Sequence, residues 1–322
     1  MFVIKAVPED FTVEEINNLT FLQSGPYLIC ELSKRLETTE DAVTLVASKL
    51  GIGRKDISYA GLKDKQAVTK QMISIKGMGM QPAASLRLDR ITLVPKGFSK
   101  EPLSLGDLEG NRFTITARNL KHPVNPLHRF VNYYGTQRFS THNTTIGKAL
   151  VKKDYKEACN LLSEHDTKYG KTIKEFLHNH PHGFVNALQQ IPFKILHLYV
   201  HSFQSLLWNM MVEKAIEQKI TLTTMPLIGF STEFDDSIEH IAEQTLREHD
   251  INRREFIIPE IPQLSLEGAE RMVFVDVPDL KIGKLENDEL NPGKKKIRLT
   301  FSLPKGSYAT VYLTQLFLQE SH

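Results

Sequence analysis

The segment from Tyr59 to Gln71, YAGLKDKQAVTKQ, concentrates residue types that could carry out covalent chemistry. Its single carboxylate, Asp64, lies in sequence among Lys63, Lys65 and Lys70. Aspartate is ordinarily ionised at neutral pH, and nearby lysines favour the ionised form further. An ionised carboxylate suits a nucleophile better than a general acid. The same charges also suit a solvated turn, so the pattern by itself leaves the chemistry open.

Regular elements are expected on both sides of this segment. The short runs at 56–60 and 72–75 are typical of strands, and residues 61–70 then form a polar connection between them. Upstream, Thr38 and Asp41 have the spacing of a capping box, and apolar residues follow at helical spacing up to Gly51. We therefore expect Asp64 on a connection between two strands that follow a helix.

The two ends of the chain contain strand patterns, and the middle contains helical ones. Apolar and polar residues alternate at 113–118 and 297–303, and Ser307 is expected to cap a helix over 308–318. Helical periodicity dominates about 141–275, as in 149–162 and 198–218. This order predicts a domain formed by 1–140 and 276–322, with a second domain, 141–275, inserted into it.

The composition is that of an ordinary globular protein of about two domains. The 322 residues are 41% hydrophobic and 24% charged, and no apolar run is long enough to span a membrane. Charged residues near the N-terminus argue against a signal peptide, so a cytoplasmic protein is expected. Cys30 and Cys159 are too few for a disulfide framework or a cysteine-rich metal module. The 40 basic and 38 acidic residues leave a charge of +2, so any basic surface must be local.

Two further patterns are not expected to bind a metal or a cofactor. His178, His180 and His182 alternate, but no further ligand has suitable spacing and Pro181 indicates a loop. The Gly77–Gly79 segment lacks the third glycine of a dinucleotide-binding loop.

Five segments, in chain order, resemble the TruD family of tRNA pseudouridine synthases. AGLKDKQAVTKQ, around Asp64, is the longest and most specific of them. The others are KAVPEDF from Lys5, LGDLEGNRF ending at Phe113, NYYGTQRF from Asn132, and LPKGSYAT from Leu303. Much of 215–260 carries no such resemblance.

The resemblance implies an activity and a fold. It implies that Asp64 is the nucleophile that converts a uridine in tRNA, at position 13 in the dihydrouridine arm, to pseudouridine. No cofactor is needed, because the substrate isomerises.

The implied fold is α/β (α+β): a pseudouridine-synthase-type catalytic domain on a mixed, largely antiparallel sheet, with 141–275 as an inserted α/β domain. The expected partner is tRNA, with no membrane and no obligate protein partner, and the expected state is a monomer. The alternative function is a non-catalytic RNA-binding or RNA-chaperone protein on the same fold.

The resemblance also implies a set of substrate-binding residues. Lys5 matches a basic active-site residue that would pair with Asp64. Phe113 would stack on the flipped uracil, and Asn111 lies two residues earlier on the same strand face. Phe113 can equally be an inward residue of an alternating strand. Phe11 resembles a second active-site aromatic, although an apolar residue opening a strand is equally ordinary.

Other charged residues have weaker roles. Lys63 is expected only as a supporting substrate-binding residue. Three basic clusters could meet phosphates, although such lysines are also usual in solvated turns. They are Lys294–Lys296 with Arg298, Lys152 with Lys153, and Lys63 with Lys65 and Lys70.

Overall fold

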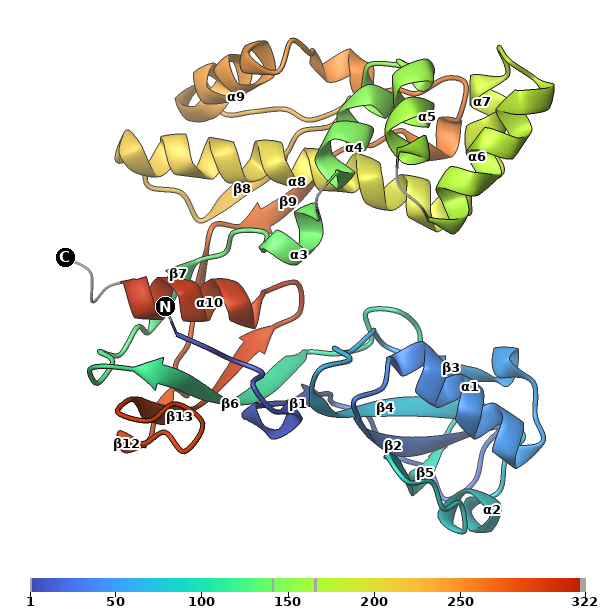
Figure 1. The fold of residues 1–322 in the computed structure, drawn as a ribbon, viewed down its shortest axis with the longest axis vertical. Helices are drawn as coiled ribbons and strands as arrows, with labels where there is room; N and C mark the ends of the chain where they lie inside the picture. The colour runs from blue at the N-terminus through green and yellow to red at the C-terminus, as the bar shows by residue number, and fades with distance from the viewer. Residues whose placement is uncertain (1, 141, 165–166, 319–322) are drawn as a thin grey trace. The chain divides into compact units, whose positions relative to one another are not determined.

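The computed structural model describes residues 2–140, 142–164 and 167–318. It divides into two compact units (Figure 1): unit 1 contains the chain up to Phe130 and from Val275 onward, and unit 2 contains Val131–Phe274. The division after Phe130 comes earlier than the domain boundary expected after residue 140, because Tyr133 and Tyr134 pack against the core of unit 2. The assignment of 141–275 as a family insertion domain stays a prediction.

Unit 1 is built on one sheet. Among the described residues it has nine strands in the order β11-β13-β6-β1-β4-β2-β5, with β12 paired to β13 and β3 to β4. The strands are β1 (Phe11–Ile16), β2 (Tyr27–Arg35), β3 (Ile57–Tyr59), β4 (Val68–Lys76), β5 (Ile91–Ser99), β6 (Gly110–Leu120), β11 (Lys281–Ile282), β12 (Glu286–Asn287) and β13 (Lys295–Pro304). The pair β1–β4 is parallel and the other pairs are antiparallel. The expected mixed, largely antiparallel sheet with strands from both chain ends is confirmed.

The helices of unit 1 are α1 (Thr39–Leu50), α2 (Met80–Ala84) and α10 (Ala309–Leu318), with single turns of 3-10 helix at Pro8–Asp10 and Arg54–Asp56. The prediction of α1 is confirmed: the Thr38 hydroxyl accepts the Asp41 N–H, and Gly51, at φ +69°, ends the helix. The cap expected for α10 is wrong, because the Ser307 hydroxyl has no hydrogen-bond partner among the described residues.

Two helices cover the same face of this sheet at different strands (Figure 1). Helix α1 packs on β2 and β4, and α10 packs on β6 and β13. The registers align Phe301, Phe113, Val13, Thr69 and Lys34 in one row across β13, β6, β1, β4 and β2. Because opposed residues share a face, this row points towards the helices. Strand β1 and the start of β4 lie between the two helix-covered regions.

Unit 2 is mainly helical, and a two-stranded sheet of β8 (Thr224–Leu227) and β9 (Ala269–Met272) supplies its strand component. Its helices are α3 (Thr136–Phe139), α4 (Asn143–Val151), α5 (Tyr155–Ser163), α6 (Lys168–Asn179), α7 (Phe184–Leu188), α8 (Phe193–Glu217) and α9 (Asp236–Glu248), with 3-10 turns at Arg253–Phe256 and Pro262–Leu264. The chain enters unit 2 in β7 (Arg129–Val131) and leaves in β10 (Phe274–Asp276).

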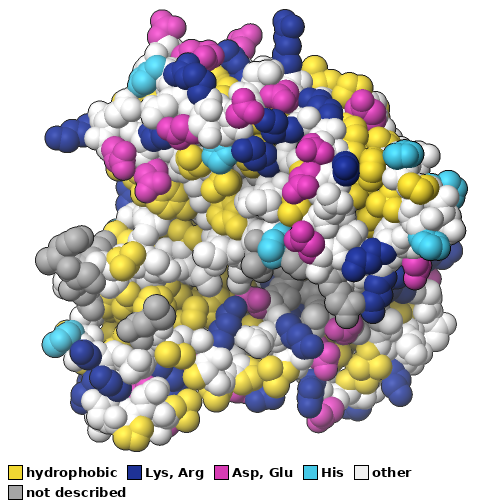
Figure 2. All heavy atoms as spheres, turned by 45° about the horizontal axis from the view of Figure 1, so that its top comes forward, with side chains coloured by type: hydrophobic (Ala, Val, Ile, Leu, Met, Phe, Trp, Pro, Cys, Tyr) yellow, Lys and Arg dark blue, Asp and Glu magenta, His cyan; other side chains and the backbone are white. Residues whose placement is uncertain are grey.

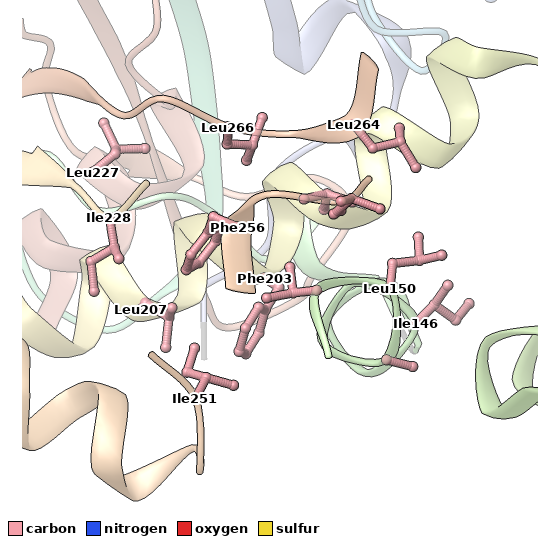
Figure 3. Packing of buried hydrophobic residues seen from close by; sticks show 14 of the residues in the cluster. Ile146, Leu150, Phe203, Leu207, Leu227, Ile228, Ile251, Phe256, Leu264 and Leu266 are labelled. Carbon is pink, nitrogen blue, oxygen red and sulfur yellow. The ribbon is translucent and has the colours of Figure 1, made fainter. Parts of the chain in front are cut away.

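Helix α8 runs through the core of unit 2. Its Phe203 and Leu207 pack in the same cluster as Ile146 and Leu150 of α4 (Figure 3). Gly147 permits this close approach, since a Cβ there would lie 2.0 Å from the Tyr199 carbonyl oxygen.

Two element predictions need correction. The single helical stretch expected over 149–162 is divided into α4 and α5, because Lys153 has a left-handed φ of +59° and Asp154 then caps α5. The connection expected over 61–70 is shorter, because Val68–Lys70 already pair with β1 and β2 as strand β4. No helix in the described part of the chain is both long and apolar enough to cross a membrane.

Candidate active site

The loop that carries Asp64 runs from Ala60 to Ala67, between β3 and β4, and buried side chains hold its backbone. The Lys63 N–H donates to the Thr39 hydroxyl at 2.9 Å, and that hydroxyl donates to the Gln71 side chain at 3.0 Å. The Gln71 amide in turn donates to the Gly61 carbonyl at 2.9 Å. Thr39 and Gln71 are both 1% exposed, so the loop is fixed from the core side.

A third side chain, Lys34 of β2, also holds this loop. Its ammonium donates to the carbonyl oxygens of Glu37 and Asp64 at 2.8 Å each, and to that of Lys63 at 3.3 Å. The residue is 1% exposed. Burial lowers the pKa of Lys34 to about 8, although the nearby Asp64 charge acts in the opposite direction. Lys34, Thr39 and Gln71 thus position Asp64, although no pattern in the sequence indicated them.

The expected pairing of Lys5 with Asp64 is present. The Lys5 ammonium donates to Asp64 Oδ2 at 2.7 Å. The Lys5 side chain is 14% exposed, and that of Asp64 is 38% exposed. The other carboxylate oxygen, Oδ1, accepts no hydrogen bond from the described residues. An oriented carboxylate with one unengaged oxygen and access to solvent can act as a nucleophile.

The backbone before β1 aims Lys5 at this carboxylate. Val3 pairs with Arg118 of β6 through two backbone hydrogen bonds, and the 3-10 turn Pro8–Asp10 then leads into β1. Between them Lys5 has a φ of +64°, a left-handed conformation that is uncommon for a residue other than glycine. Such strain persists only where the surrounding contacts impose it, and it concentrates at functional sites.

A buried charge network fixes the turn that follows Lys5. Arg118 donates to both oxygens of Asp10, at 2.8 and 2.9 Å, and to Asp288 at 2.9 Å. Burial on its own raises the pKa of Asp288, but hydrogen bonds from the Asn119 and Leu290 backbone, from Asn291 and from Arg118 outweigh it and lower this pKa to about 2. The N-terminal segment is thereby tied to the sheet.

The two predicted aromatic residues lie in one buried cluster. Phe113 is 7% exposed; its ring stacks on Phe301, with centroids 5.5 Å apart, and meets the edge of Phe11 at 6.1 Å. Phe11 is 1% exposed and lies under the Lys5 ammonium, which is 4.2 Å from the ring centroid. This cation–π contact favours a role for Phe11 in holding Lys5 rather than in touching a substrate. The stacking role of Phe113 stays a prediction, and only the ring face away from Phe301 could serve it.

Lys63 is engaged elsewhere in the site. Its ammonium pairs with Glu15 of β1 at 2.9 Å, and the two side chains are 6% and 1% exposed. The second oxygen of Glu15 accepts the Met72 N–H at 3.2 Å. Lys63 therefore joins the loop to β1 and β4 and does not pair with Asp64.

Asn111 of β6 lies opposite Glu15 of β1 in the antiparallel register. Its side-chain oxygen is buried and finds no hydrogen-bond partner in the described part of the chain. A buried polar atom left without a partner is costly, and a bound group commonly satisfies it. Asn111 thus remains available to a substrate on the face that carries Asp64.

Of the basic clusters from the sequence, Lys294–Lys296 makes no described contact with the Asp64 loop, and Lys152 and Lys153 belong to unit 2, where they donate to Asp250 and to the Glu255 carbonyl. In the cluster Lys294–Lys296, Lys296 pairs with Glu289 and Lys295 donates to Asn287. Basic and acidic side chains lie interspersed on the face shown in Figure 2. Within the described ranges, His, Cys, Asp and Glu side chains form no group of three or more that could hold a metal ion.

Comparison with known proteins identifies one family. The model of tRNA pseudouridine synthase D (TruD) matches residues 2–175, 162–225 and 214–316. The chain is 30% identical to the probable tRNA pseudouridine synthase D of Methanosarcina barkeri, over 95% of this chain and 91% of that protein. It is 28% identical to the tRNA pseudouridine synthase D of Aquifex aeolicus, over 98% of each chain. It superimposes on a crystal structure of the putative tRNA pseudouridine synthase D from Methanosarcina mazei with a TM-score of 0.78 and 27% identity, over 97% of this chain and 92% of that one.

Proposed function

This chain belongs to the tRNA pseudouridine synthase D family, an isomerase family that converts a uridine in tRNA to pseudouridine, and we propose that Asp64 is its nucleophile. The observation that carries this proposal is the half-exposed Asp64 carboxylate, held by Lys5 through one oxygen at 2.7 Å. A reactive carboxylate needs access to the substrate and a fixed orientation, and Asp64 has both.

The chemistry requires a nucleophile and no redox step. The bond from N1 of uracil to C1′ of the ribose breaks, the base turns, and a bond from C5 to C1′ forms. C5 then loses its hydrogen as a proton, and N1 gains a proton. The product is an isomer of the substrate, so electrons and atoms balance without an oxidant or a reductant. In this proposal Asp64 Oδ1 attacks either C1′, displacing N1, or the base, and the bond to Asp64 breaks again before the product leaves, so that the carboxylate is regenerated.

In this proposal the remaining side chains have different roles in binding the uridine. Lys5 orients the carboxylate, and Phe11 supports the Lys5 ammonium from below. Asn111 offers a buried amide to the polar edge of the base, and Phe113 offers an aromatic face to the ring. Taking a base out of its stack costs a few kcal/mol, and stacking on an aromatic side chain recovers about 1–3 kcal/mol.

We further propose uridine 13, in the dihydrouridine arm of tRNA, as the target. This position follows from the resemblance of the five motifs to the family. In the same proposal the protein acts in the cytoplasm, as a monomer, without an obligate protein partner.

Tritium release tests the nucleophile. Unmodified tRNA transcripts labelled with tritium at C5 of uridine are incubated with the wild type and with Asp64→Asn in the presence of a chelator. The wild type should release stoichiometric tritium and Asp64→Asn none, while tRNA binding stays within about tenfold, because phosphate contacts dominate affinity. Turnover by Asp64→Asn would refute the assignment. Binding without release by the wild type would instead favour a non-catalytic RNA-binding protein.

A second transcript that lacks only the proposed target uridine tests which position is modified. A transcript in which uridine 13 is replaced by cytidine should release no tritium, and equal release from both transcripts would overturn the proposed target.

A further inference from the structure

Lys34 is an unusual buried lysine. It is 1% exposed, and no carboxylate lies within salt-bridge distance of its ammonium in the part of the chain that the structure describes. Burying an ammonium is costly unless its hydrogen bonds are satisfied. Here three carbonyl oxygens, those of Glu37, Lys63 and Asp64, satisfy all three N–H donors. Backbone carbonyls of two segments thus offset the loss of hydration of the buried ammonium, and one of these segments is the loop that carries Asp64.

The position of Lys34 in the sheet explains why it reaches this loop. In β2 it lies opposite Thr69 of β4, in the row that continues to Val13 and Phe113. The loop joins β4 only a few residues before Thr69. A lysine at this register therefore points to the same face as the loop and reaches its carbonyls from below. Neighbouring apolar residues on that face, such as Leu32, could fill the space but could not donate hydrogen bonds.

Asp64 is consequently held at two ends by two different lysines. Lys5 holds the carboxylate through Oδ2, and Lys34 holds the backbone carbonyl. The other core-side contacts of the loop, from Thr39 and Gln71, reach Lys63 and Gly61 and do not reach Asp64 itself. Because the Asp64 side chain is partly exposed, packing against neighbours does not fix it, and its position depends on these two contacts.

We propose that Lys34 is a positioning residue for the reaction: its buried ammonium fixes the backbone of Asp64 so that the carboxylate meets the uridine in a productive geometry. The inference rests on the proposed role of Asp64 as nucleophile. Displacement of a reacting group by about 1 Å can lower a rate about 100-fold without preventing substrate binding. Loss of Lys34 should therefore act on the chemical step and leave tRNA affinity nearly intact.

The test compares Lys34→Met with a matched lysine variant, Lys96→Met. Methionine keeps an unbranched side chain that is one heavy atom shorter, and it removes the charge and the donors. Lys96 lies on β5 of the same sheet and faces Glu31 at 3.6 Å, with no described contact to the Asp64 loop. Tritium release is measured in single turnover with saturating enzyme, at a temperature where thermal unfolding shows each variant to be folded. The dissociation constant for tRNA is measured separately.

The expected result is a separation of rate from affinity. Lys34→Met should lower the single-turnover rate constant by about 100-fold and change the dissociation constant by less than about threefold, while Lys96→Met keeps both values. A rate constant for Lys34→Met within threefold of the wild type would overturn the proposal, and so would a loss of affinity with an unchanged rate at saturation. If Lys34→Met does not fold, Lys34→Gln, which supplies a neutral amide donor in place of the ammonium, is judged by the same two criteria.

Asp64→Asn in the same assay separates this inference from the proposed function. If Asp64→Asn is inactive and Lys34→Met keeps the wild-type rate, only the inference about Lys34 is refuted. If Asp64→Asn turns over, the nucleophile assignment is refuted and the positioning role is refuted with it.

Discussion

Phe113 packs in the core and is also proposed to contact the substrate, and paired substitutions can separate the two roles. Its ring is 7% exposed and stacks on Phe301, which is 0% exposed, at 5.5 Å between centroids. Both phenylalanines belong to the same core cluster. Phe→Ala at such a site costs about 3–5 kcal/mol, a large part of the roughly 5–15 kcal/mol by which a domain is stable. Alanine would therefore confuse a loss of folding with a loss of function.

Leucine is the better probe at both positions. Phe113→Leu and Phe301→Leu each keep an apolar side chain and lose the aromatic pair, which is worth about 0.5–1.5 kcal/mol beyond burial. The two variants should lose similar free energy of unfolding in urea. If Phe113 stacks on the flipped base, only Phe113→Leu also loses about 1–3 kcal/mol of base stacking, roughly a 5- to 150-fold fall in single-turnover tritium release. Phe301→Leu should stay within about threefold of the wild-type rate.

The comparison can refute the stacking role directly. Equal rates for Phe113→Leu and Phe301→Leu, measured where both are folded, would show that Phe113 acts only in the core. A larger loss of stability in Phe113→Leu than in Phe301→Leu, with equal rates, would lead to the same conclusion.

Two further predictions follow from the contacts around Asp64 and Arg118. Lys5→Met should lower the single-turnover rate by about 100-fold while the melting temperature changes little, because the pair is partly exposed; a wild-type rate would exclude the orienting role of Lys5. Asp288→Asn should lower the free energy of unfolding at pH 7. The difference in this free energy from the wild type should shrink as the pH falls from about 4 to about 2, because a carboxyl with a folded pKa of about 2 stabilises the fold only while it is ionised. Urea unfolding at pH 7, 4 and 3 measures this difference, and a constant difference would contradict the argument.

The sequence predicts elements well where local chemistry determines them. Helix α1 has its own start and stop signals, since Thr38 caps it and Gly51 ends it in the left-handed region. Strands β6 and β13 show alternation because one face of each is buried. The cap expected at Ser307 does not form, because a hydroxyl at the right spacing caps a helix only if the backbone brings an N–H to it. The Ser307 hydroxyl has no such partner among the described residues.

The site is less accessible to such reasoning, because its contacts join distant parts of the chain. Lys5 and Asp64 are brought together only when β1 and β4 pair in parallel. The resemblance to a family implied the contact between Lys5 and Asp64, which sequence spacing could not indicate. Lys63 was expected only as a supporting substrate-binding residue, and its pairing with Glu15 across the β1–β4 junction has no signal in the local sequence. Lys34 was overlooked since a lysine in a strand ordinarily faces solvent, and its acceptors are backbone atoms that carry no sequence signal.

These contacts show how one loop can be both reactive and rigid. In its proposed role as nucleophile Asp64 must reach a uridine and cannot be enclosed, so the usual means of fixing a side chain, close packing, is not available to it. The fold instead fixes the loop beneath it, where Lys34, Thr39 and Gln71 are buried, and orients the carboxylate from one side with Lys5. Lys5, which is mostly buried, and Lys34, which is fully buried, therefore act on different parts of Asp64. Removing the Lys5 charge frees the carboxylate, whereas removing the Lys34 charge frees the backbone that carries it.

If both statements hold, the single-turnover rate constant of the double variant Lys5→Met with Lys34→Met should fall by less than the product of the two single fold-losses, because either change alone already releases Asp64 from its productive position.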